Sequence, residues 1–181
     1  MTKKHFLDGE TIYLRPLSLD DLAADYPAWL NDPEVSAHNS HHTFPYTLGQ
    51  AKGYVESIQN DPQNLVLAIV AKDTDKHIGN IALQRIHLVD RNAEYAIMLG
   101  DKNYWGKGVG REASKLLLAH GFSVLNLHRI YCGTSSNNVA MQKLAIALGM
   151  REEGRRREAQ FKNGEYVDII EYGILENEFA A

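Results

Sequence analysis

The order of segments along this sequence predicts an α/β (α+β) fold: a mixed, mostly antiparallel central sheet of about seven strands, flanked by helices on both faces. Three observations carry this prediction. Apolar strand-like segments follow one another between residues 65 and 99 with only short polar turns between them, which is typical of an antiparallel meander. Helical segments precede and follow this meander, so helices must cover the sheet. Near the C-terminus, Asn163-Gly164 separates two strand-like segments and is the strongest short-range signal for a β-hairpin.

The first half of the chain contains two predicted helices. We expect them over 18–31 and 47–60, because each begins with a hydroxyl residue followed three positions later by Asp or Gln, the pattern of a capping box. The segment between them, 32–46, holds two prolines and three histidines and is predicted to be an irregular loop. The predicted strands of this half are 11–17, 65–72, 77–88 and 93–99.

The second half continues with two more helices and three more strands. One helix is expected over 106–121, directly after a glycine-rich segment, and the other over 138–148, where Gly149 ends it. The predicted strands are 128–134, 155–161 and 166–175.

Length and composition exclude several classes of protein. The chain has 181 residues and a mass of 20.3 kDa, which predicts a single domain over 1–181. An apolar fraction of 44% excludes a wholly disordered chain. Cys132 is the only cysteine, so a disulfide framework and a four-cysteine zinc site are both excluded. A net charge of −4 argues against nucleic acid as a partner.

The sequence carries no signal for a membrane. The N-terminal residues lack the apolar stretch of a signal peptide, and the longest apolar runs fall far short of a bilayer span. We therefore expect a cytoplasmic protein without a membrane partner.

The segment from Tyr104 to Gly110 alternates glycine with other residues, follows a predicted strand and opens a predicted helix. Successive backbone N–H groups at a helix N-terminus form an anion site suited to a diphosphate, and glycine permits its close approach. The alternative is a flexible connector whose glycines only form a tight turn. A Walker loop is disfavoured because Gly106-Lys107 is followed by Gly108, and a Rossmann fingerprint is disfavoured by the preceding antiparallel meander.

Several motifs in order resemble the GNAT superfamily of acyl-CoA-dependent N-acyltransferases, and most of all its RimJ/RimL-like branch. The resemblance covers nearly the whole chain and implies a GNAT-type sheet and acetyl-CoA as co-substrate. It also implies direct attack of a primary amine on the thioester in a ternary complex. No metal is expected, because no paired carboxylate spacing accompanies the histidines of the 32–46 loop. The matching motifs are Leu14 to Leu17, Trp29 to Val35, Ala93 to Ala113, Leu125 to Ile130, Asn138 to Met150, and the C-terminal segments at Glu153, Gly164 and Ile174.

The resemblance also implies positions for the cofactor. The pantetheine arm is expected along the backbone of Met98, Leu99 and Gly100, and Asn138 is expected to contact it. The diphosphate loop is expected at Trp105, Gly106, Lys107, Gly108, Val109 and Gly110.

Catalysis requires that the amine lose a proton and that the developing oxyanion be stabilised. Glu94 stands where some members carry a general base, although it could equally be a solvent-facing strand residue. The backbone N–H of Met98 is the expected oxyanion donor. Ala145 occupies the position where a proton-donating tyrosine is usual, so water or another hydroxyl must serve. The nearby hydroxyl residues are Tyr104, Tyr131, Ser135 and Ser136.

The acceptor amine is the least defined part of the prediction. His38, His41, His42 and Tyr46 lie in the loop expected to line the acceptor cleft, although for each histidine a polar surface role is an alternative. The acceptor is expected to be a small molecule such as an amino sugar or antibiotic, or a protein N-terminus, and a homodimer is possible. A non-catalytic acyl-CoA-binding module is the alternative function, which Ala145 keeps open.

Overall fold

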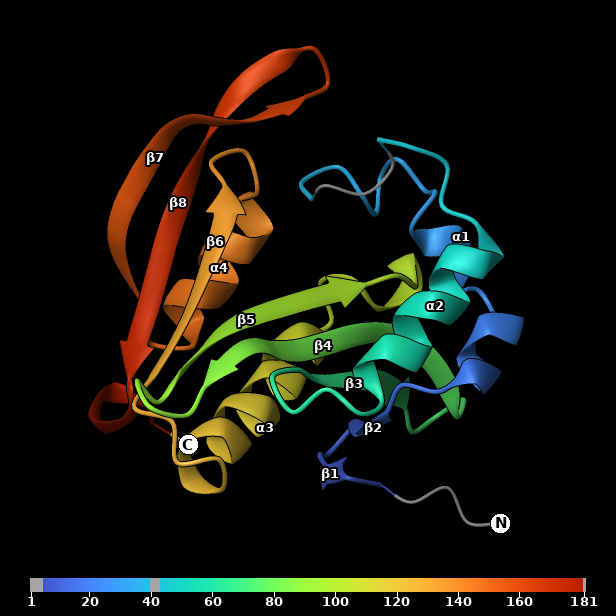
Figure 1. Cartoon of the computed structure of the whole chain (residues 1–181), viewed down its shortest axis with the longest axis horizontal. Coiled ribbons are helices and arrows are strands. Elements are labelled where there is room, and N and C mark those ends of the chain that lie inside the picture. The colour runs from blue at the N-terminus through green and yellow to red at the C-terminus, as the bar shows by residue number, and fades with distance from the viewer. Residues whose placement is uncertain (1–4, 40–42, 181) are drawn as a thin grey trace.

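The computed structural model describes residues 5–39 and 43–180, and a single eight-stranded sheet runs through it (Figure 1). The strand order is β1-β2-β3-β4-β5-β6-β8-β7, and every neighbouring pair is antiparallel except β5 and β6. The mixed, mostly antiparallel sheet is thus confirmed. The strands are β1 Leu7–Asp8, β2 Ile12–Pro16, β3 Leu65–Ala71, β4 Lys76–His87, β5 Asn92–Leu99, β6 Arg129–Ser135, β7 Arg151–Lys162 and β8 Glu165–Leu175.

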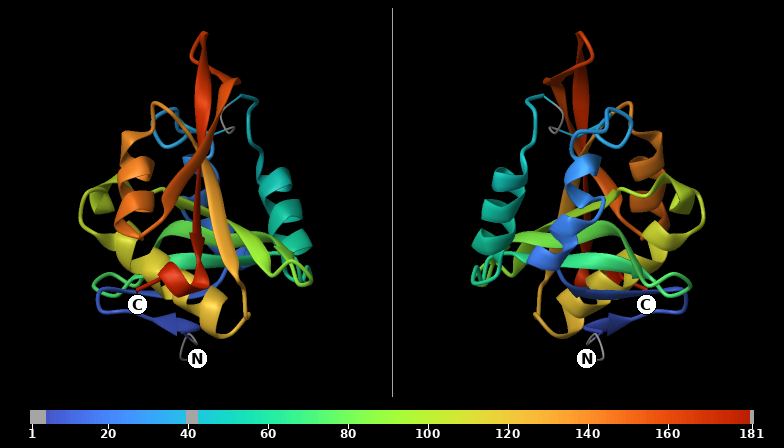
Figure 2. Two further views of the ribbon diagram at one scale, coloured as in Figure 1. Left: turned by 90° about the vertical axis from the view of Figure 1, so that its left-hand side faces the viewer. Right: turned by 90° about the vertical axis from the view of Figure 1, so that its right-hand side faces the viewer.

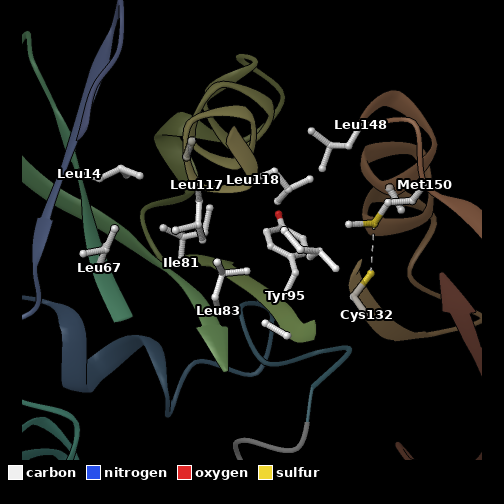
Figure 3. Packing of buried hydrophobic residues seen from close by; sticks show 14 of the residues in the cluster. Leu14, Leu67, Ile81, Leu83, Tyr95, Leu117, Leu118, Cys132, Leu148 and Met150 are labelled. Carbon is white, nitrogen blue, oxygen red and sulfur yellow. Dashed lines mark hydrogen bonds between the residues drawn. The ribbon is translucent and has the colours of Figure 1, made fainter. Parts of the chain in front are cut away.

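Helices cover both faces of the sheet, as predicted (Figure 2). On one face, α3 (Val109–Ser123) and α4 (Val139–Ala147) enclose the larger apolar core, part of which is drawn in Figure 3. On the other face, α1 (Tyr26–Trp29) and α2 (Leu48–Ile58) enclose a smaller core. Strand β3 contributes alternate residues to each core, which explains why it is an unbroken apolar run instead of an alternating one.

The predicted helix over 18–31 was wrong in its extent. The chain instead forms the 3₁₀ helix η1 (Leu19–Ala23) and then the short α1. Pro27 explains the break, because its ring clashes with the preceding turn and it has no N–H to continue a helix. By contrast, the capping box of α2 forms as expected: the Thr47 side chain accepts from Gln50 N at 3.2 Å and Thr47 N donates to the Gln50 side chain at 2.8 Å.

Strands β5 and β6 are the only parallel neighbours, and they stay paired for only three positions. Asn92 to Glu94 on β5 lie opposite Arg129 to Tyr131 on β6. Beyond these positions the strands diverge (Figure 1), and β6 continues in register with β8. The part of β5 after Glu94 therefore keeps its partner β4 on one edge, and no strand of the described residues pairs with the other. We call the opening between this part of β5 and β6 the gap.

Candidate active site

The glycine-rich loop ends at the N-terminus of α3, as the sequence predicts. Gly106 and Gly108 have φ angles of 71° and 81°, in the left-handed region that favours glycine. A Cβ built on either residue would have no heavy atom within 4 Å, so the protein leaves open space above both. The first intrahelical bond is donated by Glu112 N to Gly108 O, and the earlier N–H groups of the helix stay available to a ligand.

Positive charge accompanies these N–H groups. Lys107 is exposed in the loop, with its Nζ 5.7 Å from the centre of the Tyr104 ring, and Arg111 is exposed in the first turn of α3. These two cations and the helix dipole favour an anion at this end of α3, while the carboxylate of Glu112, also in the first turn, is directed away to accept from Thr11 N. The loop has the donors, the space and the charge that a diphosphate requires.

The free edge of β5 can be read from its register. Gly100 N donates to Ile78 O on β4 at 3.0 Å. Because peptide groups alternate between the two edges of a strand, this bond directs those of Met98 and Gly100 toward β4. The peptide groups of Ile97 and Leu99 consequently face the edge that lacks a strand.

This register corrects the expectation for Met98 and Gly100. The N–H of Met98 lies on the β4 side and is not free to stabilise an oxyanion. Gly100 serves packing instead: a Cβ there would come within 1.8 Å of Trp29 Cδ2. The Leu99 peptide group faces the free edge, where its carbonyl accepts from Trp105 Nε1 at 2.9 Å, so Trp105 ties the loop to the strand.

Asn138 caps α4 at its N-terminus and Ala145 lies within that helix, which follows β6 in the chain. The side-chain oxygen of Asn138 accepts from Met141 N at 3.1 Å. Only its amide N–H₂ therefore remains for a cofactor arm. Ala145 is fully buried in the larger core, and its methyl group offers no proton to a leaving thiolate.

A cavity of about 280 Å³ lies on the opposite face of the sheet, beneath α1 and α2. Ala96, Ile97 and Met98 of β5 form part of its wall, so the cavity adjoins the strand that borders the gap. Tyr46, a predicted acceptor residue, is among the lining residues. The other lining residues are Tyr26, Leu30, Asn39, Tyr54, Val66, Asn80, Ile81, Ala82 and Gln84.

The polar groups described in this wall are phenols and amides. Burial raises the pKa of Tyr26, Tyr46 and Tyr54, so these hydroxyls stay neutral near pH 7 and act as hydrogen-bond partners, not as bases. Sequence reasoning missed Tyr26, Tyr54, Asn80 and Gln84. In the sequence, Asn80 and Gln84 are four residues apart in one predicted strand, and this even spacing places both side chains on the same face of β4.

Glu94 lies next to this cavity without lining it. Its side chain is on the same face of β5 as those of Ala96 and Met98, and its Oε2 is 3.1 Å from Arg85 Nη1. Tyr131 lies directly opposite Glu94 on β6, at the last paired position before the gap. The carboxylate is therefore held at the point where the cavity and the gap approach each other.

The remaining candidates are placed as follows. His41 and His42 lie outside the described residues, and His38 is exposed without lining the cavity. The Tyr104 hydroxyl donates to Asp73 Oδ1 at 3.1 Å, toward the turn between β3 and β4. Ser135 is buried and its hydroxyl accepts from Asn137 N at 3.3 Å. Of the four hydroxyl residues considered as proton donors, Tyr131 lies nearest to Glu94 in the sheet register.

The described part of the chain holds neither a metal-binding cluster nor a helix that could cross a membrane. No group of three His, Cys, Asp or Glu side chains lies close enough there to hold a metal ion. Within the same residues, no helix has the length and apolar character needed to cross a bilayer.

Comparison with known proteins places this geometry among acetyltransferases. Residues 11–151 match the family described as acetyltransferase (GNAT) domain. An uncharacterized N-acetyltransferase, p20, of Bacillus licheniformis is 31% identical over 175 residues, which cover 94% of this chain and 96% of that protein. Spermidine N(1)-acetyltransferase of Escherichia coli (strain K12) is 33% identical over 113 residues, covering 62% of this chain and 60% of that protein.

Solved structures agree with the sequence matches. Spermidine N-acetyltransferase from Vibrio cholerae, in complex with CoA and spermine, superposes with a TM-score of 0.85 at 25% identity. The superposition covers 93% of this chain and 97% of that one.

Proposed function

The chain belongs to the GNAT acetyltransferase family, and from this membership we propose that it transfers an acetyl group from acetyl-CoA to the primary amine of a small molecule. That the protein is an N-acetyltransferase using acetyl-CoA follows from the family match and its relatives. The choice of a small-molecule acceptor and the roles of individual residues are our proposal, as is the single domain over 1–181. The RimJ/RimL-like branch, the cytoplasmic location and the homodimer stay predictions.

One observation carries the proposal: β5 connects both halves of the site. Its free edge faces the gap toward β6, the loop that follows it ends at the N-terminus of α3, and Ala96 to Met98 form a wall of the cavity. A cofactor with its diphosphate on the loop and its arm along Ile97 and Leu99 would present its thioester at the edge of the cavity. An amine held in the cavity would then reach the carbonyl carbon.

The loop residues Trp105 to Gly110 would hold the diphosphate through backbone N–H groups, with Lys107 and Arg111 adding charge. Asn138 would contact the arm through its amide N–H₂, the part of its side chain that the helix cap leaves free.

In the transfer itself, the amine nitrogen attacks the thioester carbon, a C–N bond forms and the C–S bond breaks. We assign the oxyanion donor to a peptide N–H on the free edge of β5, that of Ile97 or Leu99, because a fixed backbone donor needs no reorganisation. Glu94 would take the proton that the amine loses. The leaving group is a thiolate, and thiols ionise near pH 8.5, so departure does not require the tyrosine that Ala145 replaces.

The size and composition of the cavity favour a small acceptor. Its volume of about 280 Å³ lies just below the usual range of small-molecule pockets, which begins at about 300 Å³. Tyr46, predicted to contact the acceptor, is in its wall, and apolar residues of β3 to β5 form its floor.

A thiol-release assay with acetyl-CoA and a panel of primary amines tests the proposal. We expect release of CoA that depends on the amine, and an N-acetylated product by mass spectrometry. Acetylation of peptide N-termini but of no small amine would refute the assignment of the acceptor. CoA binding without turnover on any amine would refute the proposal as a whole and support a non-catalytic module.

A further inference from the structure

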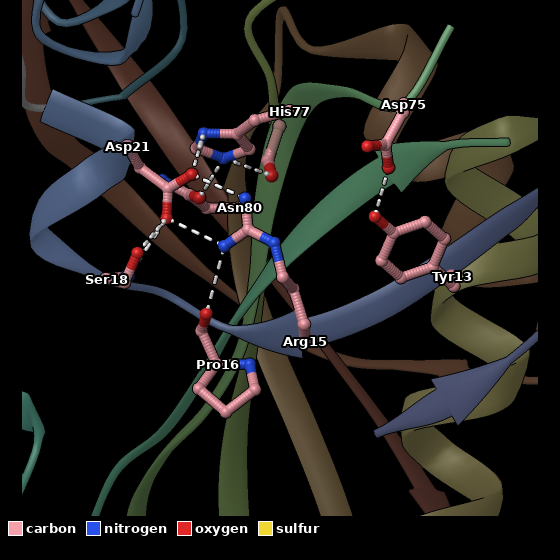
Figure 4. Close-up of polar contacts among 9 residues, drawn as sticks. Tyr13, Arg15, Pro16, Ser18, Asp21, Asp75, His77 and Asn80 are labelled. Carbon is pink, nitrogen blue, oxygen red and sulfur yellow. Dashed lines mark hydrogen bonds and ion pairs between the residues drawn. The ribbon is translucent and has the colours of Figure 1, made fainter. Parts of the chain in front are cut away.

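A buried cluster of polar side chains lies beside the acceptor cavity, and the proposed mechanism does not use it (Figure 4). Arg15 donates to both carboxylate oxygens of Asp21, at 2.8 and 2.6 Å. Ser18 N donates to Asp21 Oδ2 at 2.9 Å. On the other side of Asp21, His77 Nδ1 lies 3.3 Å from Oδ1, and the side chains of both residues are only 4% exposed. Such a buried arrangement holds each member in one orientation.

The far side of the His77 ring contacts two oxygen atoms. Its Nε2 is 2.9 Å from the carbonyl oxygen of Gly79 and 2.8 Å from Oδ1 of Asn80. A carbonyl can only accept, so the Gly79 oxygen requires a hydrogen on Nε2. A protonated Nε2 in turn requires an acceptor at Asn80, which is the side-chain oxygen and not the amide nitrogen.

This orientation requires a proton on Nε2, so it excludes the neutral ring whose only proton is on Nδ1, facing Asp21. The neutral ring with its hydrogen on Nε2 and the doubly protonated ring both donate from Nε2. A second proton would sit on Nδ1, facing Asp21. In either state the oxygen of Asn80 points at His77.

Asn80 also lines the acceptor cavity. With its oxygen bound by His77, its N–H₂ group is the end that remains for the cavity. The structure describes no hydrogen bond from this nitrogen to another protein group. The other polar side chains described in this wall are uncharged amides and phenols: Asn39, Gln84, Tyr26, Tyr46 and Tyr54.

The described lining residues include no Asp, Glu, Lys, Arg or His. A second ammonium group buried here would lose its hydration without gaining a carboxylate, which is costly. An uncharged oxygen would instead gain the N–H₂ donor of Asn80. The wall thus favours an amine that carries an uncharged oxygen over an amine that carries a second ammonium group.

Building on the proposed function, we propose that Asn80 determines acceptor specificity by donating a hydrogen bond to an uncharged oxygen of the acceptor, and that His77 positions it. The substrate class is a small primary amine bearing an amide or hydroxyl oxygen, in preference to a polyamine. Arg15 and Asp21 fix His77 and do not touch the acceptor.

Three amines of similar size test this inference. 3-Aminopropanamide carries an amide oxygen, 3-methylbutylamine replaces its amide by an isopropyl group, and 1,4-diaminobutane carries a second ammonium. We expect the wild-type kcat/KM for the amide to exceed that for the isopropyl amine by about 10-fold, the usual value of one hydrogen bond to a buried donor. The diamine should be the poorest of the three.

Variants then assign the preference to Asn80. Asn80→Asp keeps the size and the bond from His77 but replaces the donor in the cavity with an anion. We expect it to abolish the preference for the amide and to raise kcat/KM for the diamine. Asn60→Asp makes the same chemical change on the exposed surface after α2 and should leave the ranking unaltered.

His77 variants separate positioning from packing. His77→Gln can still donate to Asn80 and should keep the amide preference, whereas His77→Leu cannot and should lose it, with the KM for acetyl-CoA unchanged in both. Loss of preference in both variants would overturn the positioning role. A wild-type preference for the diamine, or an unchanged ranking in Asn80→Asp, would overturn the inference while leaving the proposed function intact. No acetylation of any amine would overturn both.

Discussion

Gly108 offers the sharpest perturbation of the proposed diphosphate site. It is the N-cap of α3 with φ 81°, and no heavy atom lies within 4 Å of a Cβ built on it. Gly108→Asp therefore meets no steric clash within the protein. The left-handed backbone costs about 1–2 kcal/mol of stability for a non-glycine residue. That strain is present with and without ligand, so it does not enter the affinity for CoA.

The effect on affinity comes from the new carboxylate. At roughly 6 Å from one phosphate charge, with an effective dielectric between about 20 and 80, the repulsion is about 1–3 kcal/mol. We expect CoA to bind roughly 5- to 150-fold more weakly. Isothermal titration calorimetry with CoA measures this directly, and Gly108→Ala separates the bulk of a side chain from its charge.

Gly164 provides a matched control. It has φ 86°, equally open surroundings and an exposed position in the hairpin between β7 and β8. Gly164→Asp therefore introduces the same strain and the same charge away from the loop, and should bind CoA like wild type. If Gly108→Asp also bound CoA like wild type, the assignment of the diphosphate to this loop would be refuted.

Three further predictions concern other parts of the molecule. Glu94→Gln should lower kcat/KM by about 100-fold if Glu94 is the base, most strongly at low pH where free amine is scarce, and a pH profile identical to wild type would remove it from that role. Burial raises the pKa of the Cys132 thiol to about 12, so a thiol reagent at pH 8 should label the native protein far more slowly than the unfolded chain, and fast labelling would contradict this. Burial alone would raise the pKa of Asp21, but the hydrogen bonds from Arg15, the charge of His77, the hydrogen bond from Ser18 N and the charge of Arg15 together outweigh it and hold that pKa below its usual value. The carboxylate therefore stabilises the fold above about pH 4 and loses this effect as the pH falls further. In urea unfolding, Asp21→Asn should cost about 3–5 kcal/mol at pH 7, because Arg15 is left buried without its partner, and the deficit should shrink below pH 4.

Much of the fold could be predicted from local sequence. The Asn163-Gly164 turn, the capping box at Thr47 and the run of apolar strands each reflect interactions within a few residues. The two-residue strand β1 could not be predicted, because it is too short to show alternation and depends on pairing with β2. The first helix was predicted to be too long. A capping box indicates where a helix begins but not where it ends, and Pro27 interrupts this one.

The glycine loop could also be predicted, since glycine at Gly106 and Gly108 reflects a backbone requirement that acts locally. The edge of β5 could not. Peptide groups alternate along a strand, so a shift of one residue exchanges those that bond to β4 with those that face the gap. The bonds from Gly100 N to Ile78 O and from Trp105 Nε1 to Leu99 O resolve the alternation, in favour of Ile97 and Leu99 over Met98.

The cavity and the cluster around Asp21 were beyond sequence reasoning for a different reason. Their members come from β2, η1, α1, α2, β3, β4, β5 and the segment before α2, and no repeat or spacing connects residues so far apart. Asp21 shows the difficulty well. Its spacing from Ser18 indicates a helix cap, and it does accept from Ser18 N, but its larger role is to bind Arg15 and to face His77.

A crystal structure with CoA and 3-aminopropanamide would test the central claim most directly. The account predicts the diphosphate on the N–H groups at the start of α3, the pantetheine arm against the free edge of β5 at Ile97 and Leu99, and the amine in the cavity with its amide oxygen at Asn80 Nδ2. CoA bound away from the Gly106 to Gly110 loop, or the amine bound outside the cavity, would contradict it.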